Sequence, residues 1–179
     1  MMYKFSNHQI ALATIADIVA IKNLLNNAYR GEASKKGWTT EAHLIAGNVR
    51  TDENNVLEVM QLQGSIFLKY IDDDGLISGC VNLQKHQYKI YLGMFGVLPN
   101  MQNAGIGKSL LKAAEEYAKQ LHCTCIYMSV ISERTELINW YQKHGYMDTN
   151  ERKPFVEDGL TGKHLQPLEF MVLEKNLPI

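Results

Sequence analysis

The chain has few of the residues that cross-link or interrupt a fold. Its 179 residues include four prolines and three cysteines, which are Cys80, Cys123 and Cys125. An odd number of cysteines, with one Cys-x-Cys pair and no surrounding cluster of ligands, is typical of reduced thiols in a cytosol. A metal site or a redox pair is the less favoured interpretation. The histidines at 86, 122 and 144 lie on different predicted elements, so no metal is expected.

An excess of charge of one sign is also absent. The formal net charge is -1, which gives no electrostatic case for binding nucleic acid or an anionic membrane surface. No apolar run is long enough to cross a bilayer, and the first five residues lack the apolar core of a signal peptide. We therefore expect a cytoplasmic protein that contacts neither nucleic acid nor a membrane.

The sequence contains no internal repeat, no low-complexity stretch and no linker rich in Pro, Gly or Ser. A hydrophobic content of 46% and a charged content of 21% are ordinary for a soluble globular protein. A chain of this length buries roughly 70% of the surface of its unfolded state. We expect a single domain over residues 1–179.

Hydrophobic periodicity predicts alternating strands and helices. Strands are expected at 10–14, 66–71, 76–83, 88–97, 126–130, from 146 onward and at 167–175, with an acidic Asp72-Asp73-Asp74-Gly75 turn joining the second and third. Helices are expected at 15–28, at 41 to about 49 with a cap from Thr39 or Thr40, at 106–121 and at 134–144. Residues 154–166 are expected to form a loop. This order of elements predicts an α/β (α+β) fold with a mixed sheet and helices on both faces.

The most informative segment runs from Val97 to Lys108, between a predicted strand and a predicted helix. A strand, a glycine-bearing turn and a helix start present unpaired backbone N–H groups together with the positive end of the helix dipole. Gly105 and Gly107 leave room for a closely approaching ligand. This segment predicts binding of a phosphorylated cofactor, although an ordinary turn that uses glycine for geometry alone remains the alternative.

Three glycine patterns compete for this segment. Gly107-Lys108-Ser109 suits a nucleotide-triphosphate loop, but the first glycine of that pattern would stand at position 102, which is Gln. A dinucleotide fingerprint starting at Gly105 needs glycine at position 110, which is Leu. The pattern Q/R-x-x-G-x-G/A is met in full by Gln102, Gly105 and Gly107, and a Val-x-Pro sequence precedes it.

A second motif follows about thirty residues later. The segment 140–146 reads Trp-Tyr-Gln-Lys-His-Gly-Tyr and matches Y-x-x-x-G-F/Y, with Gly145 as a helix stop. With both motifs in this order, the chain resembles the GNAT superfamily of acetyl-coenzyme A-dependent N-acetyltransferases, from about residue 10 to residue 177. The resemblance implies a GNAT-like (acyl-CoA N-acyltransferase) fold with a mostly antiparallel central sheet.

The resemblance also implies a cofactor site. The pyrophosphate of acetyl-CoA would meet the backbone amides that follow Gln102, namely those of Asn103, Ala104, Gly105, Ile106, Gly107 and Lys108. The splayed end of a central strand would hydrogen-bond the pantetheine arm, and Phe95, Gly96 and Val97 match that place. Taken alone, Gly96 indicates a bulge or a close backbone approach. Many relatives have Asn where this chain has Arg134, which is expected either to bind a cofactor phosphate or to cover the surface.

Tyr141 matches the family tyrosine that protonates the departing thiolate. An unperturbed phenol has a pKa of about 10, near the thiol value of about 8.5, so proton donation is feasible. A half-buried aromatic residue on a helix face is the alternative interpretation. No general base is evident, because the position of the glutamate that some relatives use is Ser129. Water, Tyr29, Glu32 or Glu41 could take the proton instead.

The acceptor site is expected along the loop 30–41. Trp38 is either a wall for the substrate or a plug for a small core. Glu32 and Glu41 suit a cationic amine, whereas Lys35 and Lys36 suit an acidic group, so the acceptor could be a small molecule, an amino acid or a polypeptide amine. Exposed strand edges make a homodimer plausible.

The sequence thus predicts an acetyl-CoA-dependent N-acetyltransferase that moves an acetyl group to a primary amine by direct attack on the thioester. A non-catalytic acyl-CoA-binding sensor on the same fold is the alternative. Nucleotide binding through Gly107-Lys108-Ser109 is the third hypothesis, weakened by Gln102.

Overall fold

Seven strands form one sheet, in the order β1-β3-β4-β5-β6-β9-β7, in the computed structural model, which describes residues 2–178. Neighbouring strands are antiparallel except for β5 and β6, which are parallel. The strands are β1 (Ile10–Leu12), β3 (Ser65–Ile71), β4 (Ile77–His86), β5 (Lys89–Val97), β6 (Cys125–Ile131), β7 (Met147–Pro154) and β9 (Glu169–Asn176). The expected mixed, mostly antiparallel sheet is confirmed.

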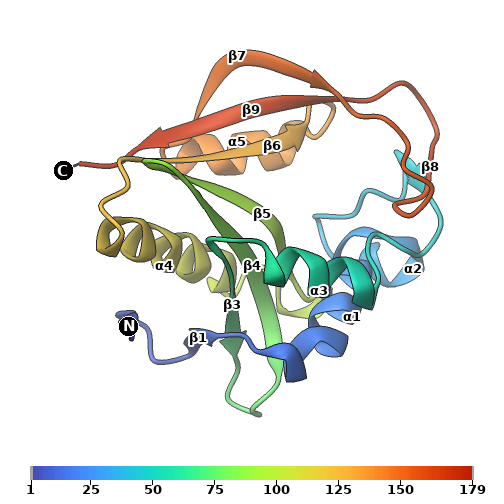
Figure 1. Ribbon diagram of the computed structural model, residues 1–179. Helices are drawn as coiled ribbons and strands as arrows, with labels where there is room; N and C mark the ends of the chain where they lie inside the picture. The colour runs from blue at the N-terminus through green and yellow to red at the C-terminus, as the bar shows by residue number, and fades with distance from the viewer. Residues whose placement is uncertain (1, 179) are drawn as a thin grey trace.

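Helices cover both faces of the sheet (Figure 1). On one face, α1 (Ile18–Tyr29) packs against β4 and β5, and α3 (Glu53–Gln61) packs against β3. On the other face, α4 (Ile106–Gln120) packs against β3 to β6, and α5 (Thr135–Lys143) shares a hydrophobic cluster with α4. Short turns complete the helical elements: η1 (Ile15–Asp17), α2 (Gly31–Ser34) and η2 (Pro99–Met101).

The predicted apolar stripe of α4 forms part of the main core. Its buried residues are Ile106, Leu110, Leu111, Ala113, Ala114, Tyr117 and Ala118. Gly79 on β4 lets this helix approach the sheet, because a Cβ there would lie 2.7 Å from the Ile106 side chain. A second cluster lies between the opposite face and α1, where Ile21, Leu24 and Leu25 pack near Phe67.

The prediction of a helix over residues 41–49 is wrong. That segment forms turns and the short strand β2 (Ile45–Ala46), which pairs with β8 (Lys163–His164) inside the predicted loop 154–166. The Thr40 hydroxyl accepts a hydrogen bond from the Ala42 amide at 3.2 Å, but both predicted capping residues also have partners outside the segment. Thr39 donates its hydroxyl to the Ala28 carbonyl at 3.1 Å, and the Thr40 hydroxyl lies 2.6 Å from that of Ser34. These contacts anchor the segment to the end of α1 and to α2.

The helix that precedes β3 in the sequence is α3, which begins after Asp52. The Asp52 carboxylate accepts a hydrogen bond from the Asn55 amide at 2.7 Å, which is an N-cap of the usual kind. The first helix also differs slightly from prediction, because α1 ends at Tyr29 and Gly31, with φ of +65°, opens the separate turn α2.

Strands β5 and β6 separate after a short parallel contact. Their pairing joins only Lys89–Tyr91 to Cys125–Tyr127, although β5 continues to Val97 and β6 to Ile131. The β4–β5 register shifts between Cys80 and Asn82, opposite Met94, whose φ is +40°. The diverging strand ends leave an opening in the middle of the sheet, and this opening positions the site described below.

Candidate active site

Two cavities meet where β5 and β6 separate. The first, here called the α4 cavity, measures about 260 Å³ and lies against the start of α4, the end of β5 and α5. The second, the β6 cavity, measures about 480 Å³ and lies between the end of α1, β5, β6 and the segment that follows β7. Both cavities are lined by Tyr29, Phe95, Leu137 and Tyr141. The two cavities therefore adjoin at these four side chains, where β5 and β6 separate.

The glycine-bearing turn forms one end of the α4 cavity. Gly105 has φ of +82° and stands at the N-cap of α4, with no atom within 4 Å of the place where its Cβ would lie. No side chain caps α4 within the described part of the chain, and the backbone bond from Ser109 to Gly105 measures 3.0 Å. The amides of the first turn are consequently available to an anion, and the positive end of the helix dipole reinforces them.

Most of the residues predicted to contact the cofactor line the α4 cavity: Phe95, Gly96, Val97, Gln102, Asn103, Gly105, Ile106, Gly107 and Lys108. Ala104 belongs to the same turn but is not part of the lining. Gly107 lies beneath Trp140 and Phe95, since a Cβ there would be 3.4 Å from the first ring and 3.6 Å from the second.

Gln102 and Gly96 also make contacts within the fold that were not predicted from the sequence. The Gln102 side chain accepts a hydrogen bond from the Trp38 amide at 2.8 Å and donates to the Val97 carbonyl at 3.1 Å, so it joins the loop after α2 to the end of β5. A Cβ on Gly96 would lie 3.1 Å from the Leu24 side chain on α1. The close approach inferred for Gly96 is thus the approach of α1.

Tyr141 stands at the junction of the two cavities. Its side chain is buried between Phe95, Trp140 and Tyr146, with ring centroids 5.2 to 6.3 Å away. Burial raises the pKa of Tyr141 well above its ordinary value, and the neighbouring Tyr29 acts in the same direction. The phenol is therefore protonated throughout the neutral pH range and can donate a hydrogen.

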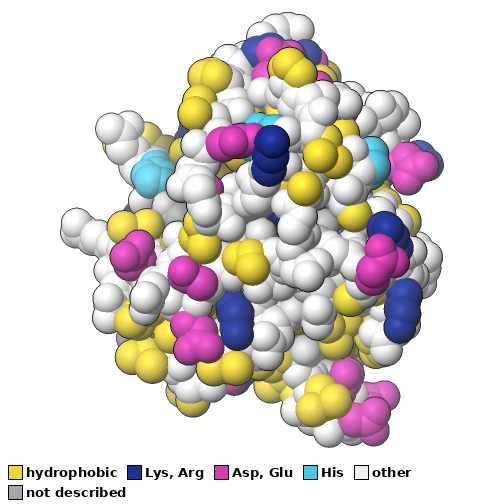
Figure 2. Space-filling view, turned by 90° about the vertical axis from the view of Figure 1, so that its right-hand side faces the viewer, with side chains coloured by type: hydrophobic (Ala, Val, Ile, Leu, Met, Phe, Trp, Pro, Cys, Tyr) yellow, Lys and Arg dark blue, Asp and Glu magenta, His cyan; other side chains and the backbone are white. Residues whose placement is uncertain are grey.

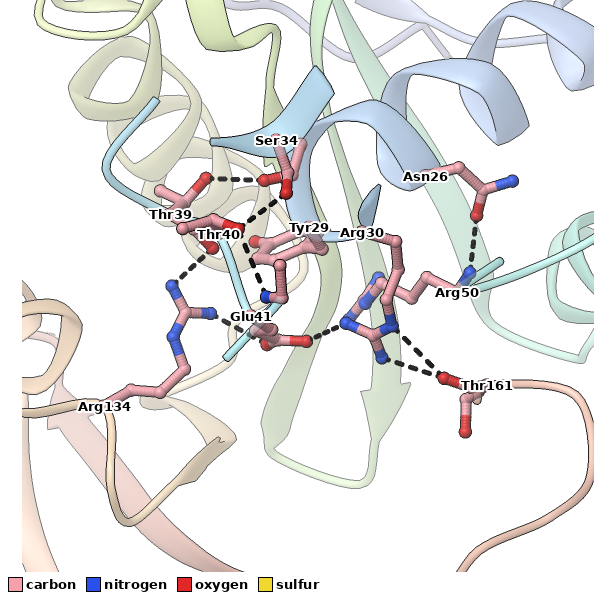
Figure 3. Close-up of polar contacts among 12 residues, drawn as sticks. Asn26, Tyr29, Arg30, Ser34, Thr39, Thr40, Glu41, Arg50, Arg134 and Thr161 are labelled. Atoms are coloured by element: carbon pink, nitrogen blue, oxygen red, sulfur yellow. Dashed lines mark hydrogen bonds and ion pairs between the residues drawn. The ribbon is translucent and has the colours of Figure 1, made fainter. Parts of the chain in front are cut away.

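Glu41 lines the β6 cavity and is paired with two arginines that line the same cavity. Figure 3 shows Arg30 and Arg134 approaching its carboxylate from opposite sides. Arg30 forms an ion pair with one carboxylate oxygen, and Arg134 contacts the other at 2.8 Å. Burial acts to raise the Glu41 pKa, but the charges of Arg134 and Arg30 outweigh it and hold the pKa below its usual range. This doubly paired carboxylate, ionised at neutral pH, is poorly suited to remove a proton or to bind a cationic amine.

The remaining predicted residues fall in three different places. Arg134 lines the β6 cavity and not the α4 cavity, so its predicted contact with a cofactor phosphate stays a prediction. It is only 7% exposed and also donates to the Thr39 carbonyl at 2.6 Å, so the alternative that it covers the surface is wrong. Trp38 lines the α4 cavity rather than the β6 cavity, with its ring 6.2 Å from that of Trp140. Glu32 is exposed, pairs with Lys35 and lines neither cavity.

Arg50 is the residue of the β6 cavity that sequence reasoning missed most clearly. Its guanidinium lies 4.5 Å from the centre of the Tyr29 ring, and its backbone amide donates to the Asn26 side chain at 2.7 Å. The residue follows the segment wrongly predicted to be helical, and no local pattern in the sequence marks it. Tyr91 and Ser129 also line this cavity, from the facing strands β5 and β6.

Comparison with known proteins fits this geometry. The model of the acetyltransferase (GNAT) family matches residues 20–146. The chain belongs to this family. Its members use acetyl-CoA. Within residues 2–178 no three His, Cys, Asp or Glu side chains gather as metal ligands, and no helix is both long and apolar enough to cross a membrane.

Among curated proteins, the chain is 41% identical to the uncharacterized protein YdhI of Bacillus subtilis over 147 residues, which are 82% of this chain and 74% of YdhI. Solved structures share the fold at lower identity. YncA of Salmonella typhimurium, solved with its cofactor acetyl-CoA, is 22% identical with a TM-score of 0.68, over 97% of this chain and 96% of that one. The ribosomal-protein-S18-alanine N-acetyltransferase of Escherichia coli is 12% identical with a TM-score of 0.70, over 95% and 94%.

Proposed function

We propose that this protein transfers an acetyl group from acetyl-CoA to a primary amine by direct attack of the amine on the thioester. The observation that carries the proposal is the meeting of two cavities from opposite faces of the sheet at Tyr29, Phe95, Leu137 and Tyr141. In this proposal the α4 cavity takes the cofactor and the β6 cavity takes the acceptor. Orienting two reactants in this way removes much of the entropic barrier to a bimolecular reaction.

The α4 cavity fits coenzyme A at both of its ends. The open space in front of Gly105 and the amides at the start of α4 suit the pyrophosphate. The other end of the cavity is formed by Phe95, Gly96 and Val97, where β5 has left β6 and its backbone can bind an extended ligand. When bound, acetyl-CoA supplies the activated acetyl thioester.

Tyr141 is the proposed general acid. Tyr141 lines both cavities, and its raised pKa keeps the phenol protonated until a strong base forms beside it. A thiolate released in this desolvated junction is more basic than in water, which favours transfer of the Tyr141 proton. Removal of the acceptor proton is assigned to water, because Glu41 is the one carboxylate of the described residues lining the β6 cavity and is already paired with two arginines.

The lack of an uncommitted carboxylate or imidazole among the described residues of the β6 cavity favours one alternative, a sensor that binds acyl-CoA without turnover. Calorimetric titration with acetyl-CoA, with ATP as comparison, tests the cofactor assignment. Release of free thiol in the presence of an amine panel then tests catalysis. Binding of acetyl-CoA with amine-dependent thiol release supports the proposal, binding without thiol release supports the sensor, and binding of ATP alone overturns both.

A further inference from the structure

The β6 cavity concentrates positive charge. Its lining contains four cationic side chains, Arg30, Arg50, Arg134 and Lys153, against the single carboxylate of Glu41. The outer surface is different: on the face shown in Figure 2, basic and acidic side chains are interspersed. The cavity proposed to hold the acceptor therefore carries a surplus of positive charge that the face in Figure 2 does not show.

Two of these cations are fully engaged by the protein. Arg30 pairs with Glu41 and donates two further hydrogen bonds to the Thr161 carbonyl, each 3.2 Å long. Arg134 pairs with the same carboxylate and with the Thr39 carbonyl. Glu41 brings only one negative charge against these two arginines, so any additional cation in the cavity adds to a surplus of positive charge.

Arg50 is such an additional cation. Within residues 2–178 its guanidinium forms no ion pair with a carboxylate. It is partly buried, and its guanidinium carbon lies 4.5 Å from the centre of the Tyr29 ring, within the range of a cation–π contact. Arg50 lines the same cavity as Tyr141, and its charge acts to lower the pKa of that tyrosine.

We infer that the acceptor is a small amine that carries a carboxylate, and that Arg50 binds this carboxylate. The inference rests on the proposed function and narrows its substrate class. A planar guanidinium offers two parallel N–H donors that match the two oxygens of a carboxylate. The Tyr29 ring supports the guanidinium through a cation–π contact, and Asn55 lines the same cavity. Polyamines and other acceptors without an anionic group are repelled by the surplus positive charge.

The test compares matched acceptors with the wild-type protein and three variants. Free amino acids and their carboxamides serve as acceptors, with acetyl-CoA as donor and free thiol as readout. We expect kcat/KM to be about 10- to 100-fold higher for the amino acid than for its amide, the range of one charge-assisted interaction. Arg50→Gln removes this preference by lowering kcat/KM for the amino acid alone, and Arg50→Lys restores part of it. Arg152→Gln, which alters an exposed arginine paired with Asp148 outside both cavities, leaves the preference unchanged.

A second measurement separates this inference from the proposed function. N-acetylated amino acids and their amides are titrated calorimetrically into wild-type protein and Arg50→Gln, which requires no turnover. Binding of the carboxylate form that is lost in Arg50→Gln supports the inference even where no amine is acetylated and the proposed function fails. Equal binding or turnover of acids and amides, or an equal loss of both in Arg50→Gln, overturns the inference while leaving acetyl transfer intact.

Discussion

Tyr29, the last residue of α1, donates its phenolic hydrogen to the backbone carbonyl of Phe95 on β5. This bond attaches the end of a helix to the strand segment that borders both cavities. Tyr29 also supports the guanidinium of Arg50 on its ring, so one side chain connects the proposed cofactor and acceptor sites. The relative position of the two reactants should depend on it.

Replacing Tyr29 with Phe removes the hydroxyl and keeps the ring. The buried Phe95 carbonyl then loses a partner, and we expect a loss of about 1–3 kcal/mol in the free energy of unfolding. Thermal melting measures this change, and the KM for acetyl-CoA is expected to rise with it because the Phe95 backbone is less well fixed. Tyr88→Phe is the control, since Tyr88 is 73% exposed and its substitution should leave both quantities unchanged. An unaltered melting temperature in Tyr29→Phe would show that the bond contributes no stability.

Replacing Tyr141 with Phe tests the proposed general acid. We expect turnover to fall by about 10²- to 10⁴-fold, the usual contribution of a positioned acid, while the affinity for acetyl-CoA hardly changes. Initial rates of thiol release and calorimetric titration measure the two effects separately. Tyr127→Phe is a matched control, because Tyr127 lies on β6 but lines neither cavity. Equal losses of turnover and affinity in Tyr141→Phe would indicate a structural tyrosine.

The elements that carry the fold were predictable where their signals are local. The stripe of α4 and the glycine turn before it depend on residues only a few positions apart, and the structure confirms both elements. The helix predicted over 41–49 does not form, although the Thr40 hydroxyl accepts a hydrogen bond from the Ala42 amide as an N-cap would. The segment is instead held by the bond from the Glu41 amide to the Tyr29 carbonyl and by the pairing of β2 with β8. Hydrogen bonds across such distances leave no periodic trace in the sequence.

The residues of the proposed site also differ in how far the sequence predicts them, according to whether they stand in a local motif. Gln102, Gly105 and Tyr141 stand in recognisable motifs, and the structure brings them to one cavity. The surroundings of Glu41 were not predictable, because one of the two arginines paired with it, Arg134, is 93 positions away. Arg50 belongs to a segment without a recognisable motif. Only the structure, which places it over the Tyr29 ring, identifies it as a residue of the site.

Substitution of Gly105 tests the phosphate-binding turn. Its φ of +82° makes Gly105→Val strained by about 1–2 kcal/mol, and the branched side chain would project into the space proposed for the pyrophosphate. We expect the affinity for acetyl-CoA to fall at least about tenfold, as expected when even one hydrogen bond to a charged group is lost. Gly75→Val is the control that separates backbone strain from obstruction of the ligand site. Gly75 has φ of +79° and equally open surroundings, but it lies in the turn between β3 and β4. Unchanged acetyl-CoA affinity in Gly105→Val would remove the basis for placing the pyrophosphate here.

Replacing Glu41 with Gln leaves the buried guanidinium groups of Arg30 and Arg134 without their shared carboxylate. Breaking a buried ion pair from one side costs about 3–5 kcal/mol, and we expect a loss of that order in the free energy of unfolding. Urea denaturation at neutral pH measures it. Glu32→Gln is the control, because that exposed carboxylate pairs only with Lys35 on the surface and should change the unfolding midpoint little.

The same carboxylate gives the wild-type protein a defined response to acid. The pKa of Glu41 is lower in the folded protein than its ordinary value of 4.5, so the folded state binds the proton less readily than the unfolded chain. Its stabilising contribution is therefore complete above pH 4.5 and is lost as the pH falls below that value towards the folded pKa. The difference in unfolding free energy between wild-type protein and Glu41→Gln, measured by urea titration from pH 7 downward, should shrink in that acidic range. A difference that stays constant across the range would mean that Glu41 does not titrate as a paired carboxylate.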